Sequence, residues 1–137
     1  MTVRTVARPR GHPGYSAQLP SVVGSAGTAR RLVRIALCAW GLEPLADDAE
    51  IVVTELVSNA VEHAGGQPVR VTVVRPGPGT VRIGVVDRSR VLPVPRVSVP
   101  DDEHGRGLAV VDVLAQCWGV TQLPSGKSVW AVLGGGD

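Results

Sequence analysis

Apolar residues recur along this chain at helical spacing in three places and at strand spacing in four. The first helical stripe begins after Ser21 and ends at Trp40, directly before Gly41. A glycine that follows the last apolar position is a common helix stop, so we expect a helix over about residues 23–40. The side opposite the stripe carries Arg30, Arg31 and Arg34. We expect these arginines on a solvated face or on a surface for a partner.

A second helical stripe predicts a helix whose body covers residues 49–64. Its apolar positions stop at Gly65-Gly66. Asp47 or Asp48 is placed to cap the N-terminus, and acidic residues there suit the positive end of the helix dipole.

The rest of the chain predicts four strands and a third helix. Alternation over residues 69–73 and again from residue 81, with Pro76-Gly77-Pro78-Gly79 between, predicts an antiparallel hairpin that ends at Asp87. A helix over 108–115, a strand near 119–122 and a last strand over 128–133 follow. Residues 88–104 form a long irregular stretch, and loops this long in a compact domain are usually functional or disordered.

The order of these elements indicates the α+β class. We expect a two-layer α/β sandwich, with a mostly antiparallel mixed sheet and the helices on one face. Residues 1–20 are rich in proline, glycine and arginine and show no period, so we expect a flexible N-terminal arm there and the folded domain over 21–137.

Composition excludes several classes of protein. The 137 residues, 44% hydrophobic and 19% charged, fit one folded domain and exclude a coiled coil or a disordered chain. There is no apolar run as long as a membrane span, and the net charge is only +2. The arginine- and proline-rich start has no apolar stretch, so we expect no secretory signal there. We therefore expect a cytoplasmic protein without membrane or direct nucleic-acid partners. Cys38 and Cys117 lie in apolar runs and are expected to be buried free thiols.

Asparagine and lysine occur once each, as Asn59 and Lys127, and thirteen of the fourteen basic residues are arginine. Phenylalanine is absent. The codons of phenylalanine, asparagine and lysine are rich in A and T, so their scarcity indicates a GC-rich genome. The two survivors are candidates for side chains whose chemistry is hard to replace, although chance would leave the same count.

Polar residues recur every four positions on the second helix, at Glu55, Asn59 and His63, so they lie one turn above another. The neutral oxygen of asparagine suits Mg²⁺, which takes few protein ligands. The carboxylate one turn earlier can accept a proton or order a water. The same spacing also describes an ordinary solvated helix face.

Three weaker signals follow along the chain. Asp87 ends an apolar strand, where it can accept a hydrogen bond from an exocyclic amine such as that of adenine, or simply end the strand in a turn. Gly105-Arg106-Gly107-Leu108 is a glycine-rich turn at a helix start, where the backbone can approach a phosphate. Ser125-Gly126-Lys127-Ser128 combines a turn, a cation and a hydroxyl, compatible with phosphate or with a plain hairpin.

Taken in order, these motifs resemble the histidine kinase-like (GHKL, Bergerat-fold) ATPase domain. The resemblance is closest to bacterial anti-sigma-factor serine/threonine kinases and to the single-domain ATP-binding regulatory proteins of actinomycetes. It covers about residues 21–133. The motifs that carry it are Glu55-Leu56-Val57 through Asn59-Ala60-Val61 and His63, Gly105-Arg106-Gly107-Leu108, Trp118-Gly119-Val120, and Gly126-Lys127-Ser128-Val129-Trp130.

One motif departs from the family. Many members carry D-x-G-x-G at the strand end, whereas here Asp87 is followed by Arg88-Ser89-Arg90. The turn after Asp87 must therefore be built differently, and we expect adenine to be held more loosely.

The resemblance implies ATP and Mg²⁺ as cofactors and gives roles to the candidate residues. Asn59 would hold Mg²⁺, Glu55 would be the general base, and Asp87 would accept from the adenine amine. Residues 88–104 would be the ATP lid. The remaining nucleotide contacts would come from His63, Gly105, Arg106, Gly107, Leu108, Lys127 and Ser128. For His63, a histidine favoured by the dipole at a helix end is an equally open interpretation.

The function implied is that of an ATP-binding regulatory protein. It would be an anti-sigma factor with Mg-ATP-dependent serine/threonine kinase activity toward an anti-sigma-factor antagonist. Its partners would be a sigma factor, that antagonist, or both, with a homodimer as a further possibility. The alternative is an ATP-binding interaction module that regulates a partner without phosphoryl transfer.

Overall fold

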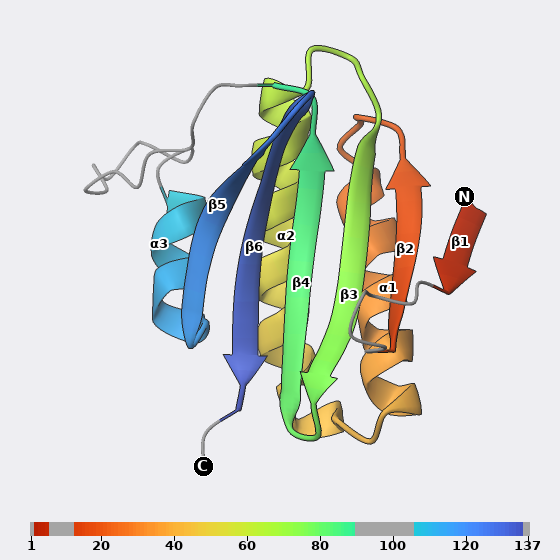
Figure 1. Cartoon of the computed structure of the whole chain (residues 1–137), viewed down its shortest axis with the longest axis vertical. Helices are drawn as coiled ribbons and strands as arrows, with labels where there is room; N and C mark the ends of the chain where they lie inside the picture. The colour runs from red at the N-terminus through yellow and green to blue at the C-terminus, as the bar shows by residue number, and fades with distance from the viewer. Residues whose placement is uncertain (1, 6–12, 90–105, 136–137) are drawn as a thin grey trace.

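A computed structural model of the chain describes residues 2–5, 13–89 and 106–135. They form two layers, a six-stranded sheet and three α-helices on one of its faces (Figure 1). The strand order is β1-β2-β3-β4-β6-β5, and each neighbouring pair is antiparallel. The expected α+β sandwich is confirmed. The elements are β1 (Thr2–Thr5), β2 (Gly14–Leu19), α1 (Ser25–Ala39), the 3-10 turn η1 (Glu43–Leu45), α2 (Ala46–His63), β3 (Val69–Gly77), β4 (Thr80–Asp87), α3 (Arg106–Leu114), β5 (Cys117–Leu123) and β6 (Gly126–Gly134).

Strand β2 is the main departure from the expected elements. It pairs with β3 from Gly14 opposite Val74 to Leu19 opposite Val69, and Ala17 and Leu19 are buried. The expectation of irregular chain over residues 1–20 is therefore wrong for this segment. The segment has no run of β-branched residues, so its strand conformation comes from pairing with β3 and burial under α1 rather than from local preference.

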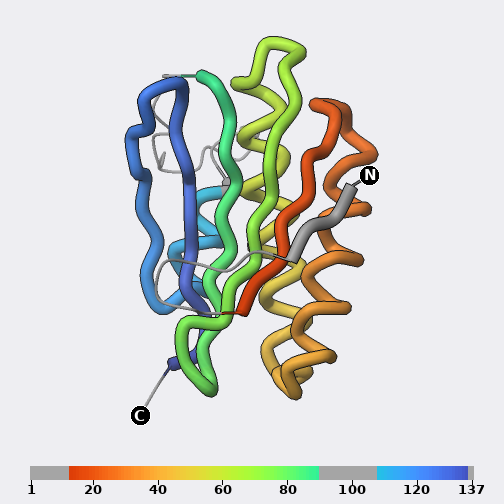
Figure 2. The backbone as a smooth tube through the Cα atoms, turned by 45° about the vertical axis from the view of Figure 1, so that its right-hand side comes forward, coloured from red at the N-terminus to blue at the C-terminus, as the bar shows by residue number. Residues whose placement is uncertain are grey.

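The core lies between the sheet and the helices. Alternate residues of the two central strands point inward and are fully buried, because neighbouring side chains of a strand face opposite sides. These residues are Val69, Val71, Val73, Val81, Ile83 and Val85. Figure 2 shows the helices together behind the sheet, and no described helix covers the opposite face. None of the helices in the described ranges has the length and apolar character needed to span a membrane.

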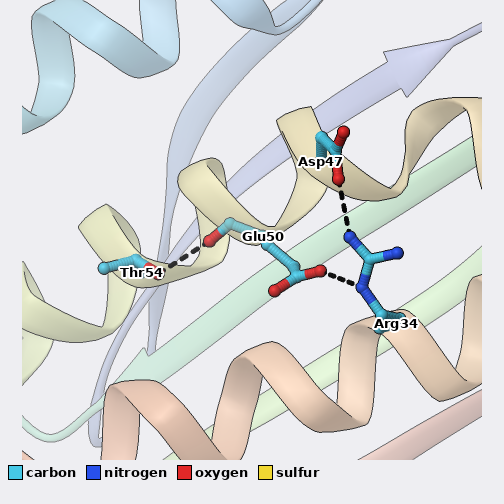
Figure 3. Close-up of polar contacts among 4 residues, drawn as sticks. All are labelled: Arg34, Asp47, Glu50 and Thr54. Atoms are coloured by element: carbon cyan, nitrogen blue, oxygen red, sulfur yellow. Dashed lines mark hydrogen bonds and ion pairs between the residues drawn. The ribbon is translucent and has the colours of Figure 1, made fainter.

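Helices α1 and α2 are joined on their outer side by a polar bridge (Figure 3). Arg34 donates from Nη2 to Asp47 Oδ1 at 2.7 Å and from Nε to Glu50. Arg30 donates to the hydroxyl of Thr54, which donates to the backbone oxygen of Glu50. The hydrogen bonds to Asp47 and Glu50 raise the pKa of Arg34 above its ordinary value. Two of the three arginines therefore contact α2 instead of standing free in solvent.

The start of α2 also differs from the expectation. The helix begins at Ala46 after Leu45, and no side chain caps it. Asp47 and Asp48 lie inside the first turn, where they suit the dipole but cannot cap. Asp47 instead forms the ion pair with Arg34.

Both cysteines, Cys38 and Cys117, are free and exposed, so the expectation of buried thiols is wrong. Cys38 directly follows the buried residues Ala36 and Leu37 on α1. Cys117 begins β5, which lies at one edge of the sheet. An apolar run therefore did not reveal which of its side chains faces the core.

Candidate functional site

The candidate residues gather at one end of the molecule. Asn59 and His63 belong to the last turns of α2, β4 ends at Asp87, and β6 begins beside Lys127. These three element ends lie together at the top of Figure 1. Since α2 packs against β4 and β4 pairs with β6, the fold brings residues from distant parts of the sequence to the same end.

Three buried polar atoms at this end have no hydrogen-bond partner among the described residues. They are Asn59 Oδ1, His63 Nδ1 and Asp87 Oδ2. A buried polar atom left unpaired costs roughly 1–3 kcal/mol, and native proteins leave few of them. All three belong to side chains that the sequence singled out for a nucleotide. A ligand, an ion or bound water would satisfy them.

The other oxygen of Asp87 is fully engaged. Oδ1 accepts the backbone N–H of Ser89 at 2.7 Å and the Nζ of Lys127 at 3.1 Å. Both charged side chains have no exposed surface. The two residues stand opposite each other in the β4–β6 pairing, so the sheet itself places the cation against the carboxylate. The sequence singled out both residues but not their contact.

The turn after Asp87 forms without the glycines of the family motif. The side chain of Asp87 accepts the amide of Ser89 two residues later, which is the hydrogen bond of an Asx turn. With Lys127 on the same oxygen, the carboxylate is held from two sides. The structure therefore fixes the orientation of Asp87 without D-x-G-x-G.

Gly126 supports this arrangement from β6. It has φ +155°, and a Cβ built on it would overlap the backbone carbonyl of Asp87 and the Cα of Arg88. The glycine thus allows the two chains to approach closely beside the Asp87–Lys127 pair.

Gly126→Ala is expected to destabilise the protein by about 1–3 kcal/mol, because the methyl group meets backbone atoms that cannot rotate away. Thermal unfolding followed by circular dichroism measures the change. Gly24→Ala is the control, since nothing lies within 4 Å of a Cβ there and its φ is −63°. Equal midpoints for the two variants would contradict the close approach at Gly126.

Glu55 lies on α2 with Asn59 and His63. It is half-buried one turn before Asn59. The groove that it lines has a volume of about 400 Å³, and its other lining residues are Arg30, Arg34, Asp47, Glu50, Ile51 and Thr54. Asp87 lines a different cavity of about 120 Å³ with residues near the ends of β2, β3 and β4. Glu55 thus borders the groove over α1 and α2.

The remaining candidates are placed less favourably or lie outside the description. Ser128 neighbours Lys127 on β6, and adjacent strand residues face opposite sides, so its hydroxyl lies on the face away from Asp87. Leu108 is buried, with 4% of its surface exposed. Arg106 and Gly107 form the first turn of α3, with only their backbone described. Gly105 and residues 90–104 of the expected lid fall outside the described residues.

Comparison with known proteins identifies the family. The profile of the histidine kinase-like ATPase domain matches residues 19–133. The chain belongs to this family, as its motifs predicted, and ATP is the nucleotide that the family implies.

Two further proteins are similar to this chain, one in sequence and one in fold. Uncharacterized protein SCO4941 of Streptomyces coelicolor is 35% identical over 79 residues, which are 56% of this chain and 75% of that protein. The crystal structure of the RsbU and RsbW domains of Rv1364c from Mycobacterium tuberculosis has a TM-score of 0.67 at 23% identity and covers 88% of this chain. The match spans about a third of that longer chain, 32%, and shows a shared fold.

Proposed function

We propose that the protein binds Mg-ATP at the end of the molecule where α2, β4 and β6 meet. One observation carries the proposal. The three buried polar atoms without a described partner lie on Asn59, His63 and Asp87, to which the family resemblance assigns magnesium, phosphate and adenine. Side chains that serve only the fold would be satisfied within the protein.

The chemistry of each atom fits its assigned ligand. Asn59 Oδ1 is a neutral hard oxygen of the kind that Mg²⁺ takes in small number beside phosphate oxygens. Asp87 Oδ2 is an acceptor for the exocyclic amine of adenine. His63 lies in the last turn of α2, and an imidazole N–H can donate to a phosphate oxygen. Bound Mg²⁺ would supply neutralisation of the phosphate charge.

Asn59→Ala is expected to remove the Mg²⁺ dependence of ATP binding, and Asp87→Asn to weaken ATP binding roughly tenfold or more, because each removes an acceptor atom. Titration calorimetry with ATP, with and without Mg²⁺, measures both. Asp87→Asn retains an oxygen for the amide of Ser89, but it leaves the Lys127 cation buried without a counter-charge, so its binding is compared only in protein shown to be folded by circular dichroism.

Ser58→Ala is the matched control, because Ser58 is exposed beside Asn59 on the same helix. It should bind as the wild type does. Unchanged binding by Asn59→Ala, or no binding by a folded wild type, would contradict the assignment.

We further propose that the bound ATP is used to phosphorylate a serine or threonine of a partner protein. The partner class is the anti-sigma-factor antagonist, and the protein would act in the cytoplasm as an anti-sigma factor for a sigma factor, alone or as a homodimer. The placement of Glu55 supports transfer, since its half-buried carboxylate lines an open groove that a partner's hydroxyl can reach. In that role Glu55 accepts the hydroxyl proton.

A second candidate function keeps ATP binding but has no transfer. The protein would then bind ATP and change its affinity for a partner. It is supported by the fact that Glu55 and Asp87 line two different cavities.

A further inference from the structure

In the site as described so far, Lys127 holds the carboxylate of Asp87, and no atom of the nucleotide has been assigned to it. It is the single lysine of the chain, and among the described residues it has the largest fully buried side chain. Within the described residues its Nζ has one hydrogen-bond partner, Asp87 Oδ1 at 3.1 Å. Lysine is almost never fully buried unless paired, and removing two charges from water is costly even when they pair.

The Asp87–Lys127 pair presents free hydrogen-bonding capacity of both kinds. An ammonium group has three N–H donors, and one of them is used on Oδ1. Oδ1 accepts twice, while Oδ2 accepts nothing from the described residues. A free acceptor and free donors therefore lie side by side on one buried ion pair.

We propose that Lys127 reads the purine base of the nucleotide, with its Nζ donating to ring nitrogen N1 while Asp87 Oδ2 accepts from the 6-amino group. This inference rests on the proposed ATP site. Adenine carries that amine and N1 next to each other on one edge, a donor beside an acceptor. Asp87 Oδ2 is the complementary acceptor and Lys127 Nζ the complementary donor, so both gain a hydrogen-bond partner.

The same chemistry predicts which other bases fit. Hypoxanthine has O6 and N1–H in place of the amine and N1, so O6 accepts from Lys127 and N1–H donates to Asp87 Oδ2. Guanine adds a 2-amino group on that edge, which would compete with N1–H for the one free oxygen of Asp87. The site should therefore accept ITP and disfavour GTP.

The first test uses the unaltered protein. Because lysine occurs once, labelling with ¹⁵N- and ¹³C-lysine gives one side-chain signal, that of Lys127. ATP should shift this signal, and 1-deaza-ATP, in which carbon replaces N1, should leave it near its free position. Calorimetry should show 1-deaza-ATP binding roughly tenfold to a hundredfold more weakly than ATP, the effect of losing one hydrogen bond to a charged donor.

The second test pairs the analogue with a variant. Lys127→Met should bind ATP and 1-deaza-ATP with equal affinity. If the lysine were purely structural, the ratio of the two affinities would be the same in the variant as in the wild type. If the variant does not fold, the signal of the wild-type lysine and the wild-type affinities for ATP and 1-deaza-ATP still decide.

The outcomes separate the two proposals. ATP binding with an unmoved lysine signal, or equal affinity for ATP and 1-deaza-ATP in the wild type, overturns the role of Lys127 and leaves the ATP site standing. No ATP binding at all overturns the proposed function, and this inference with it.

Discussion

Lys127→Met is expected to lower the free energy of unfolding by about 3–5 kcal/mol, because it leaves the carboxylate of Asp87 buried without its cation. Methionine fills most of the space of the lysine stem, so lost packing contributes little. Urea unfolding followed by circular dichroism measures the change. An effect this large is unusual for one substitution, and it follows from the complete burial of both partners.

The control removes the second charge as well. Lys127→Met combined with Asp87→Asn leaves no buried charge and keeps an oxygen for the amide of Ser89, so it should recover much of the lost stability. A single variant within 1 kcal/mol of the wild type, or a double variant less stable than the single one, would contradict the account of the pair.

Glu55→Gln is expected to slow phosphoryl transfer to a partner hydroxyl about 10²–10⁴-fold, the usual contribution of a positioned general base. ATP affinity should stay the same, because Glu55 lines the groove over α1 and α2 and not the cavity beside Asp87. Single-turnover transfer of the labelled γ-phosphate to candidate antagonist proteins measures the rate, and calorimetry measures the affinity.

Asp48→Asn is the matched control, since it changes an exposed carboxylate on the same helix. Equal rates for wild type, control and Glu55→Gln would place the base elsewhere. A wild type that binds ATP but transfers nothing to any partner it binds would favour the interaction module.

The helices and the later strands of this fold could be predicted because their apolar patterns are strong and local. Helix α2 was expected over 49–64 and covers Ala46–His63, and the hairpin of β3 and β4 was expected from its alternation and its proline-glycine turn. Strand β2 could not be predicted this way. Its conformation depends on pairing with β3, which lies about fifty residues later in the chain.

The candidate site could be predicted residue by residue but not as an assembly. Asn59 and Asp87 were found because motif spacing is visible in one segment of sequence. The contact of Asp87 with Lys127 depends on the register between β4 and β6, which no local pattern fixes. Had the second and last predicted strands been aligned, the lone lysine opposite a strand-ending aspartate would have been the signal.

The bridge of Arg34 to Asp47 and Glu50 was missed for the same reason. It joins two helices, and the crossing of helices is set by their packed faces and not by either sequence alone. Asp47 was interpreted as a helix cap because the pattern around it does not show that Arg34 on α1 is its partner.

The central claim is that Asn59 holds the metal of a bound Mg-ATP, and the chain allows a direct test. Asparagine occurs once, so ¹⁵N-asparagine labelling gives a single side-chain amide pair in the NMR spectrum, that of Asn59. Mn²⁺, a paramagnetic substitute for Mg²⁺, broadens signals near it. We predict that the Asn59 amide signal disappears with Mn²⁺ and ATP together and persists with Mn²⁺ alone. A sharp Asn59 signal in protein saturated with Mn-ATP would contradict the claim.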